Sequence, residues 1–461
     1  MDVPECPRCR VLLARNAELE ARVLALEGQL RDLLDKLKPP TAKAATPQPP
    51  APAKKPTGKR PGGQPGHPPA MKALVPAERV NHVVPYIPER CNKCDKPLPQ
   101  EAGPKDPEPK RHQVAELPKI AAEITEHQGH ARTCLCCGEV TWATIPADIR
   151  AHSVGPKLTA AMGYFVAVHG VSKRGVEEIV EQLFETPIAL GTIANLEQEL
   201  SAALAPAHEE ARQAIATADV KYTDETGWKK NGKKRWLWVS ATATIVYFVI
   251  QARRNLDALK RVAGEKLVGI MSSDRWCVYA DWPGLRQLCW AHVKRNWEKQ
   301  IERGGSAAKR LGEAWLDGHR QVFELWHRFR AGGCTRPELD QQMKPLFVTL
   351  NAVLGDGRRT RDVKFARFCT RLTTDFPHLW TFVNHEGVEP TNNHAERVLR
   401  RAVLWRRRSF GCHSNAGCRF VERILTVVQS LRQQKHSVLE FLGETIKSHR
   451  AGKTTPRLVM G

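Results

Sequence analysis

The sequence predicts a multidomain α+β protein in which helical units flank one mixed α/β unit. Three patterns predict this class. A leucine heptad repeat and a proline-rich stretch come first, two CxxC pairs follow among short β-rich runs, and strand-like and helix-like runs then alternate. The length of 461 residues allows roughly two to four compact units.

Residues 1–38 are predicted to form a dimerising helix. Leucine recurs every seven residues, and a second seam alternates with it; the positions are Leu12, Leu19, Leu26 and Leu33, with Asn16, Val23, Leu30 and Leu37. Leucine at one seam and one asparagine at the other favour a parallel coiled coil, so we expect a homodimer or higher oligomer through residues 11–37. A single amphipathic helix packed on its own domain is the alternative. Cys6 and Cys9 precede it and either share a zinc ion between two chains or have no ligand role.

Residues 39–75 are predicted to be an extended, basic linker. Eleven prolines occur within residues 39–69, together with Lys, Ala and Gly, and this composition cannot form a packed core. The end of the stretch, GKRPGGQPGHPP, fits either a segment that lies along DNA phosphates or a plain spacer.

Residues 76–150 are predicted to form a zinc-binding domain. Two CxxC pairs supply four thiolates for one tetrahedral, structural Zn²⁺: Cys91, Cys94, Cys134 and Cys137, with Cys136 as a spare. The long gap between the pairs is expected to hold a β-hairpin, with Val114 and residues 120–124 as strand material. The alternative is a set of scattered reduced cysteines, since the chain has 13 in all and a cytoplasmic location is expected.

Residues 151–210 are predicted to form a helix-turn-helix DNA-binding domain. Apolar positions recur with helical spacing in three runs between residues 155 and 205. The last two helices are joined by a tight connection, and Thr192 and Asn195 begin the expected recognition helix. Any small helical bundle gives the same pattern.

A mixed α/β catalytic domain is predicted in two parts, residues 211–300 and 389–430. A helical insertion at residues 301–388 separates them, and residues 431–461 are expected to form a C-terminal helix and tail. The first part contains a hairpin (236–241 and 244–250), a helix (255–263) and two further strands (267–271 and 285–290).

Asp224 and Asp274 are predicted to hold divalent metal ions. Asp224 follows a strand-like run at residues 218–223 and precedes a predicted turn, Glu225 to Gly227, and Asp274 also follows a strand-like run. The 50 residues between them hold a hairpin and a helix, which makes their strands neighbours in a sheet of five mixed strands. Carboxylate oxygens suit Mg²⁺ or Mn²⁺, and paired metal sites act on phosphodiesters. Aspartate is also common where a strand meets a turn. Nearby competitors are Asp219, Glu225 and Asp281.

Glu396 is the third candidate ligand, and two interpretations of it stay open. It lies in a helix start, where Asn393 and Glu396 also fit a capping box. The same helix is rich in arginine, which places a carboxylate beside both metal and DNA; these residues are Arg397, Arg400, Arg401 and Arg406 to Arg408.

The charge of the chain indicates a polyanionic partner. There are 71 Lys and Arg against 49 Asp and Glu, a net charge of +22, and neutralised phosphates release counterions that favour binding. No membrane span is expected, because the longest uncharged apolar stretch, residues 158–171, is shorter than the ~20 residues a span needs.

Several segments together resemble the transposase family of insertion sequence sixty-six. They are DETGW (224–228), SDRWCVYAD (273–281), RQLCWAHVKRNW (286–297), EPTNNHAERVLRR (389–401) and WRRRSFGCHSNAG (405–417). The CxxC pairs, the GGQPGHPP segment and the leucine zipper resemble the family's amino-terminal half. The residues after Asp274 depart from many relatives, which have Gly where this chain has Arg275 and Trp276.

The resemblance implies an RNase H-like catalytic fold and a DDE mechanism, with Asp224, Asp274 and Glu396 as the three carboxylates. Water attacks the phosphodiester at the element's end, and the freed 3′ hydroxyl then attacks target DNA. It implies terminal inverted repeats and target DNA as partners, accessory transposition proteins, and a bacterial, nucleoid-associated location. Residues expected to support the site or contact DNA are His292, Asn392, Asn393, Arg397, Arg400 and Arg401, and Cys289 and His292 resemble a CxxH feature of related transposases.

Two other functions remain open from the sequence. One is a catalytically silent repressor that binds element ends, and the other is an RNase H-like nuclease or resolvase. The presence of all three carboxylates argues against the first, and the zipper, cysteine pairs and helix-turn-helix pattern argue against the second.

Overall fold

The computed structural model describes residues 74–104 and 106–459, and the chain divides into two units, Met1–Glu116 and Leu117–Gly461. The predictions for residues 1–38 and for most of the linker lie outside the described residues. In the first unit the described chain is largely extended, with one short 3-10 helix, η1 (Ala77–Arg79), and a tight turn that follows Cys91.

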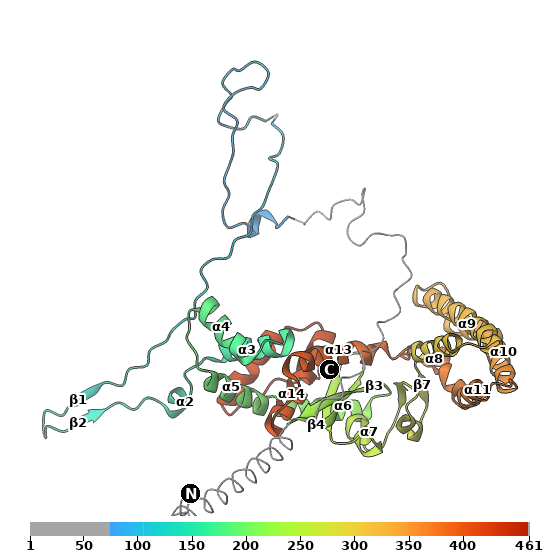
Figure 1. Ribbon diagram of the computed structural model, residues 1–461. Coiled ribbons are helices and arrows are strands. Elements are labelled where there is room, and N and C mark those ends of the chain that lie inside the picture. Colours follow the sequence, from blue (N-terminus) through green and yellow to red (C-terminus); the bar gives the residue numbers. More distant parts are fainter. Residues whose placement is uncertain (1–73, 105, 460–461) are drawn as a thin grey trace, which may run out of the picture. The chain divides into compact units, whose positions relative to one another are not determined.

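The second unit begins with a small hairpin and five helices. Strands β1 (Ala131–Thr133) and β2 (Val140–Trp142) pair antiparallel and are followed by α2 (Ala147–Arg150). The strands expected near residues 114 and 120–124 do not form; Val114 is 82% exposed and Ile124 78% exposed, so no second layer covers this stretch. The next helices are α3 (Pro156–His169), α4 (Lys173–Phe184), α5 (Leu190–Ala203) and α6 (Ala205–Thr217), the first three of which were predicted (Figure 1).

A five-stranded mixed sheet forms the centre of this unit, as expected. Its strands are β3 (Val220–Lys230), β4 (Lys233–Ala241), β5 (Val246–Gln251), β6 (Ile270–Ser273) and β7 (Arg286–Leu288), in the order β5-β4-β3-β6-β7. The β3–β4 and β4–β5 pairs are antiparallel, and the β3–β6 and β6–β7 pairs are parallel. Helix α7 (Leu256–Ala263), capped by the Asn255 side chain, and the 3-10 helix η2 (Cys277–Asp281) complete the connections.

Strand β3 corrects one expectation, because Asp224 does not end a strand. The segment Glu225 to Gly227 was predicted as a turn, but β3 continues through it to Lys230 and pairs with β4 throughout. The turn instead lies at Asn231 and Gly232, both with positive φ, as a two-residue hairpin requires. Strand β6 also begins later than predicted, since Leu267 and Gly269 have positive φ.

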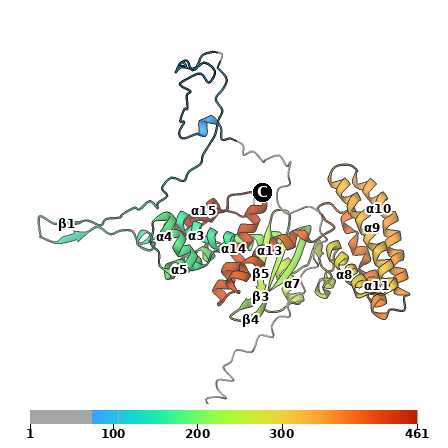
Figure 2. The ribbon, with the colours of Figure 1, turned by 45° about the horizontal axis from the view of Figure 1, so that its top comes forward.

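Helices cover both faces of the sheet. Side chains alternate along β4 and β5, so Leu237, Val239 and Phe248 pack against α13 (Asn393–Ser409) and α14 (Asn415–Gln433). Trp238 and Val249 face the other way, in a core that includes α6 and α7. The last helix, α15 (Val438–Arg450), packs against α3, and Figure 2 shows α13 and α14 crossing the sheet.

Helix α14 also satisfies the free edge of β5. The backbone N–H groups of Val246, Phe248 and Ile250 donate to side-chain oxygens of α14 at 2.9, 3.0 and 2.7 Å. The acceptors are Ser430, Thr426 and Glu422, one per helical turn. Four helical residues advance about 6 Å and two strand residues about 6.6 Å, so the two repeats match.

The helical insertion has its own aromatic core. It contains α8 (Trp290–Arg303), α9 (Ser306–Arg330), α10 (Arg336–Arg358), α11 (Val363–Asp375), η3 (Phe376–Leu379) and α12 (Thr381–Asn384). Trp315 stacks on Trp290 and Trp297, with centroids 6.0 and 5.0 Å away. The insertion therefore packs as a helical bundle, with α9, α10 and α11 side by side (Figure 2). Within the described residues, no helix is both long and apolar enough to cross a membrane.

We expect Thr426→Val to lower the free energy of unfolding by about 1–3 kcal/mol, because the substitution keeps the shape of the side chain but leaves the buried Phe248 N–H without its acceptor. Denaturant unfolding measures this. Thr445→Val is the matched control: Thr445 is equally buried, but its hydroxyl has no partner among the described residues. Equal losses in the two variants would contradict the role given to Thr426.

Candidate active site

Asp224 and Asp274 lie at the same level of two neighbouring parallel strands. The β3–β6 register pairs residues fifty positions apart, ending with Tyr222 opposite Ser272. Asp224 lies two residues after Tyr222, and Asp274 lies two residues after Ser272. The 50-residue spacing in the sequence is thus the register of the sheet itself, and it brings the two carboxylates together.

The alternation along β3 decides which acidic side chain faces α13. Tyr222 and Trp228 pack in the core beside α13 and α14. Asp224 is an even number of residues from both, so its side chain lies on the same face of β3. Glu225 lies on the opposite face, where its carboxylate binds Tyr279 and Arg254. This engagement removes Glu225 from the set of free carboxylates. Asp281, another competitor, is exposed at the end of η2.

The loop after β6 holds Asp274 in place. Its Oδ1 accepts a hydrogen bond from the Trp276 N–H at 2.8 Å. Arg275 forms an ion pair with Asp375 at 2.7 Å, and the Arg254 guanidinium lies 3.7 Å from the centroid of the Trp276 ring. Arg275 and Trp276 therefore anchor this loop to the insertion and to the segment that follows β5.

Buried Asn392 fixes the start of α13. Its side-chain Nδ2 donates to the Thr223 carbonyl at 2.8 Å, and its backbone N–H donates to Cys289 Sγ at 3.2 Å. Asn392 occupies the N-cap position of α13 but makes no side-chain cap hydrogen bond. The capping box considered for Asn393 and Glu396 is therefore not formed, and the Glu396 carboxylate is near enough to Asp224 for its charge to raise the pKa of Asp224.

The three carboxylates influence one another electrostatically. Burial, together with the charges of Glu225, Asp274 and Glu396, raises the pKa of Asp224 to about 8. One Glu396 oxygen, Oε1, is buried without a hydrogen-bond partner among the described residues. Hard oxygen donors that crowd together in this way fit a divalent cation, which would favour their ionised forms.

A second group of donors meets Glu396 from α8. The ligand atoms of Cys289, His292 and Glu396 all lie within 4.8 Å of one another. His292 Nδ1 is 3.5 Å and the Arg295 guanidinium 3.7 Å from Glu396 Oε1. His292 was predicted as a supporting residue. Arg295 was not, although it lies one helical turn after His292 and so shares its face.

The basic residues of α13 divide into two groups. Arg397 and Arg400 are exposed, as is Asn393. Among the described residues, none of these three forms a hydrogen bond or ion pair with the carboxylates. Arg401 is also exposed, but its guanidinium reaches the Val168 carbonyl at 3.4 Å, and Arg408 donates to the His169 carbonyl at 2.7 Å. These bonds place the basic face of α13 beside the end of α3.

The residues predicted to read DNA on α5 lie elsewhere in the second unit. Thr192 and the exposed Asn195 line a pocket of about 600 Å³, together with His152, Glu199 and Arg450. Glu199 is paired with Arg450 at 2.8 Å. The structure therefore does not bring Thr192 and Asn195 to the carboxylate centre.

Each CxxC pair forms the same local turn. The Cys91 N–H donates to the Lys96 carbonyl, and the Cys91 carbonyl accepts from the Asp95 N–H. In the second pair the Cys134 N–H donates to the Glu139 carbonyl, and the Cys134 carbonyl accepts from the Gly138 N–H. Asp95 and Gly138 both have positive φ. In each turn, backbone N–H groups lower the pKa of the leading thiol, Cys91 or Cys134. Such turns favour thiolates, while the four-cysteine zinc site with Cys94 and Cys137 stays a prediction.

Comparison with known proteins identifies the family. The model of the Transposase IS66 family matches residues 152–419, which is more than half of the chain and includes all three carboxylates. The chain therefore belongs to the IS66 transposase family, a family of DNA-processing enzymes. No curated protein matched the chain.

We expect Asp224→Asn to unfold at a higher temperature than the wild type when divalent cations are absent. The amide keeps the shape of the side chain but removes a buried charge that neighbouring carboxylates repel, and a gain of about 1–3 kcal/mol is expected. Thermal unfolding with a chelator, at pH 8 and above, measures it. An unfolding temperature below that of the wild type would contradict the electrostatic account of the site.

Proposed function

We propose that this chain is a DNA transposase that binds the ends of its element and cleaves and transfers DNA strands by a DDE mechanism. The observation that carries the proposal is the pairing of Asp224 and Asp274 on neighbouring parallel strands, with Glu396 on the helix that covers them. The strand order β5-β4-β3-β6-β7, antiparallel and then parallel, supports an RNase H-like assignment of this domain.

The proposed site would hold Mg²⁺ or Mn²⁺ through Asp224, Asp274 and Glu396. Such ions, when bound, stabilise the charge that develops on the attacking and leaving oxygens of a phosphodiester. The chain's own contribution is to hold three carboxylates in one place from two strands and a helix. Glu396 Oε1, which has no hydrogen-bond partner among the described residues, and the raised pKa of Asp224 both support a cation at this site.

Asn392, Cys289 and His292 are proposed as positioning residues. Asn392 fixes the first turn of α13 to β3 and to the start of α8, one turn away from Glu396. Cys289 is fully buried and accepts the Asn392 N–H, which makes it part of the same link. His292 faces Glu396 and so restricts where that carboxylate points.

DNA is proposed to lie along the exposed basic face of α13. Arg397 and Arg400 point to solvent within one turn of Glu396, so phosphates bound there would be close to the carboxylates. The tight connection between α4 and α5 supports a helix-turn-helix that binds element ends, and structural Zn²⁺ and dimerisation through residues 11–37 are proposed to hold two ends together.

We expect Asp224→Asn, Asp274→Asn and Glu396→Gln each to reduce Mg²⁺-dependent nicking of element-end DNA by at least about a thousandfold, because each removes one of three ligands that act together. DNA affinity should stay within a few fold of the wild type. Cleavage of end-labelled duplexes and a binding titration measure the two effects. Asp281→Asn, an exposed acidic residue near Asp274, is the matched control and should cleave normally.

The outcomes separate the proposal from its alternatives. Wild-type protein that binds ends but never nicks them with Mg²⁺ or Mn²⁺ would indicate a repressor. Nicking without joining of the 3′ end to a second DNA would indicate a nuclease or resolvase. Full cleavage by any of the three carboxylate variants would refute the site assignment.

We expect Arg400→Gln to weaken DNA binding and to reduce the slope of log K against log salt by about 1, because one phosphate contact and its released counterion are lost. The affinity is measured by titration at several salt concentrations. Arg310→Gln, an equally exposed arginine on α9 of the insertion, is the control and should keep the wild-type slope. Equal slopes for Arg400→Gln and the wild type would remove α13 from the DNA interface.

A further inference from the structure

An exposed aromatic residue stands at the end of the basic helix α13. Phe410 is 79% exposed and has φ 57°, a left-handed conformation that is unfavourable for a non-glycine side chain. Three arginines, Arg406 to Arg408, lie two to four residues before it. A bulky apolar side chain kept in solvent, on strained backbone and among cations, contributes nothing to the core and indicates an external contact.

The surrounding backbone is held firmly in this conformation. Cys412 N–H donates to the Lys229 carbonyl at 2.9 Å, and Asn231 N–H donates to the Cys412 carbonyl at 2.8 Å. A Cβ on Gly411 would lie 2.2 Å from the Lys229 oxygen, so only glycine allows this approach. The β3–β4 hairpin therefore fixes the loop that presents Phe410.

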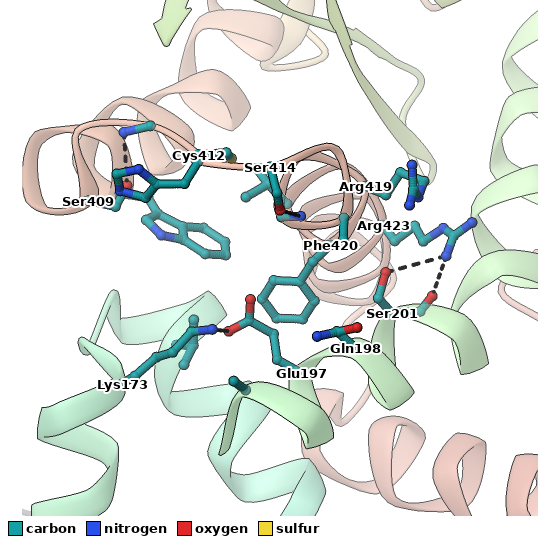
Figure 3. Close-up of a pocket in the computed structure, with 18 of the residues that line it drawn as sticks. Lys173, Glu197, Gln198, Ser201, Ser409, Cys412, Ser414, Arg419, Phe420 and Arg423 are labelled. Atoms are coloured by element: carbon teal, nitrogen blue, oxygen red, sulfur yellow. Dashed lines mark hydrogen bonds and ion pairs between the residues drawn. The ribbon is translucent and has the colours of Figure 1, made fainter. Parts of the chain in front are cut away.

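A pocket of about 540 Å³ opens beside Phe410. Its neighbours on both sides, Ser409 and Gly411, line the pocket, while Phe410 itself does not. One wall is aromatic: Trp405 and Phe420 meet edge to face with centroids 6.2 Å apart. Figure 3 shows Phe420 and Glu197 pointing toward the middle of the pocket from α14 and α5.

The polar groups of the pocket suit a nucleotide. The Glu197 carboxylate, held by Lys173 at 3.1 Å, is an acceptor for a base amino group. Arg408, Arg419 and Ser414, at the start of α14, supply cations and donors at the rim for a phosphate. The pocket therefore offers an aromatic wall and an acceptor for a base, and cations at its rim for the phosphate of the same nucleotide.

We propose that Phe410 is a wedge that separates one base pair of bound duplex DNA, and that this pocket receives the base that leaves the stack. The inference rests on the DNA-cutting function proposed above. Apolar wedges unstack neighbouring bases, and a dedicated pocket repays part of the cost of unpairing. Twelve residues of α13 separate Arg408 from Glu396, about 18 Å, so the opened pair lies roughly five base pairs from the cleaved bond.

The test is the binding of full-length protein, without divalent cations, to element-end duplexes that carry one mismatch at successive positions. A mismatch removes the cost of unpairing, so the wild type should bind one position, near the fifth base pair from the cleavage site, roughly tenfold more tightly than the paired duplex. Phe410→Asn, which tolerates the left-handed backbone, should bind the paired duplex roughly tenfold more weakly and recover on that mismatch. Phe410→Trp should behave like the wild type.

A pocket variant and a control complete the experiment. Gln198→Trp fills the pocket from an exposed position on α5, so it should weaken binding to the paired duplex without recovery on the mismatch. Val348→Ala removes an exposed apolar side chain from α10 of the insertion and should change neither affinity. The proposal is overturned if the wild type gains nothing from a mismatch at any position, or if Phe410→Asn keeps the wild-type affinities. Cleavage is not part of this readout, so a protein that opens DNA but never cuts it would refute only the proposed enzymatic function.

Discussion

The carboxylate centre depends on the buried contacts of Asn392. This one residue binds Thr223, 169 positions earlier in the chain, and Cys289, 103 positions earlier. The first contact fixes α13 beside the strand of Asp224, and the second fixes it beside the helix of His292. Because Glu396 follows within one helical turn, its position relative to Asp224 is set by these two hydrogen bonds and by the apolar packing of α13 on β3 and β4.

The sequence allowed the aspartate pair to be predicted better than its local geometry. A spacing of fifty residues with a hairpin and a helix between implies adjacent strands, and the β3–β6 register confirms it. The end of β3 could not be predicted in the same way, because Thr226 and Gly227 have turn-like composition. Pairing with β4 over nine residue pairs outweighs that local preference.

Glu396 shows why the third position was harder. Its local sequence fits a capping box and a metal ligand equally well, and only contacts with distant residues distinguish them. Arg295 was missed for a related reason: its role depends on where α8 lies relative to α13. The pocket beside Phe410 joins α3, α5, α13 and α14, so no window of sequence contains it.

The side chains of α14 that cover the edge of β5 also affect whether copies of the protein can aggregate. An unpaired strand edge is a template on which another chain can add a strand and aggregate. Ser430, Thr426 and Glu422 occupy the edge N–H groups of β5, and at the other edge the Thr381 hydroxyl donates to the Arg286 carbonyl of the short strand β7. The β5 edge is therefore closed to strand addition, so copies that gather at high local concentration do not associate through it.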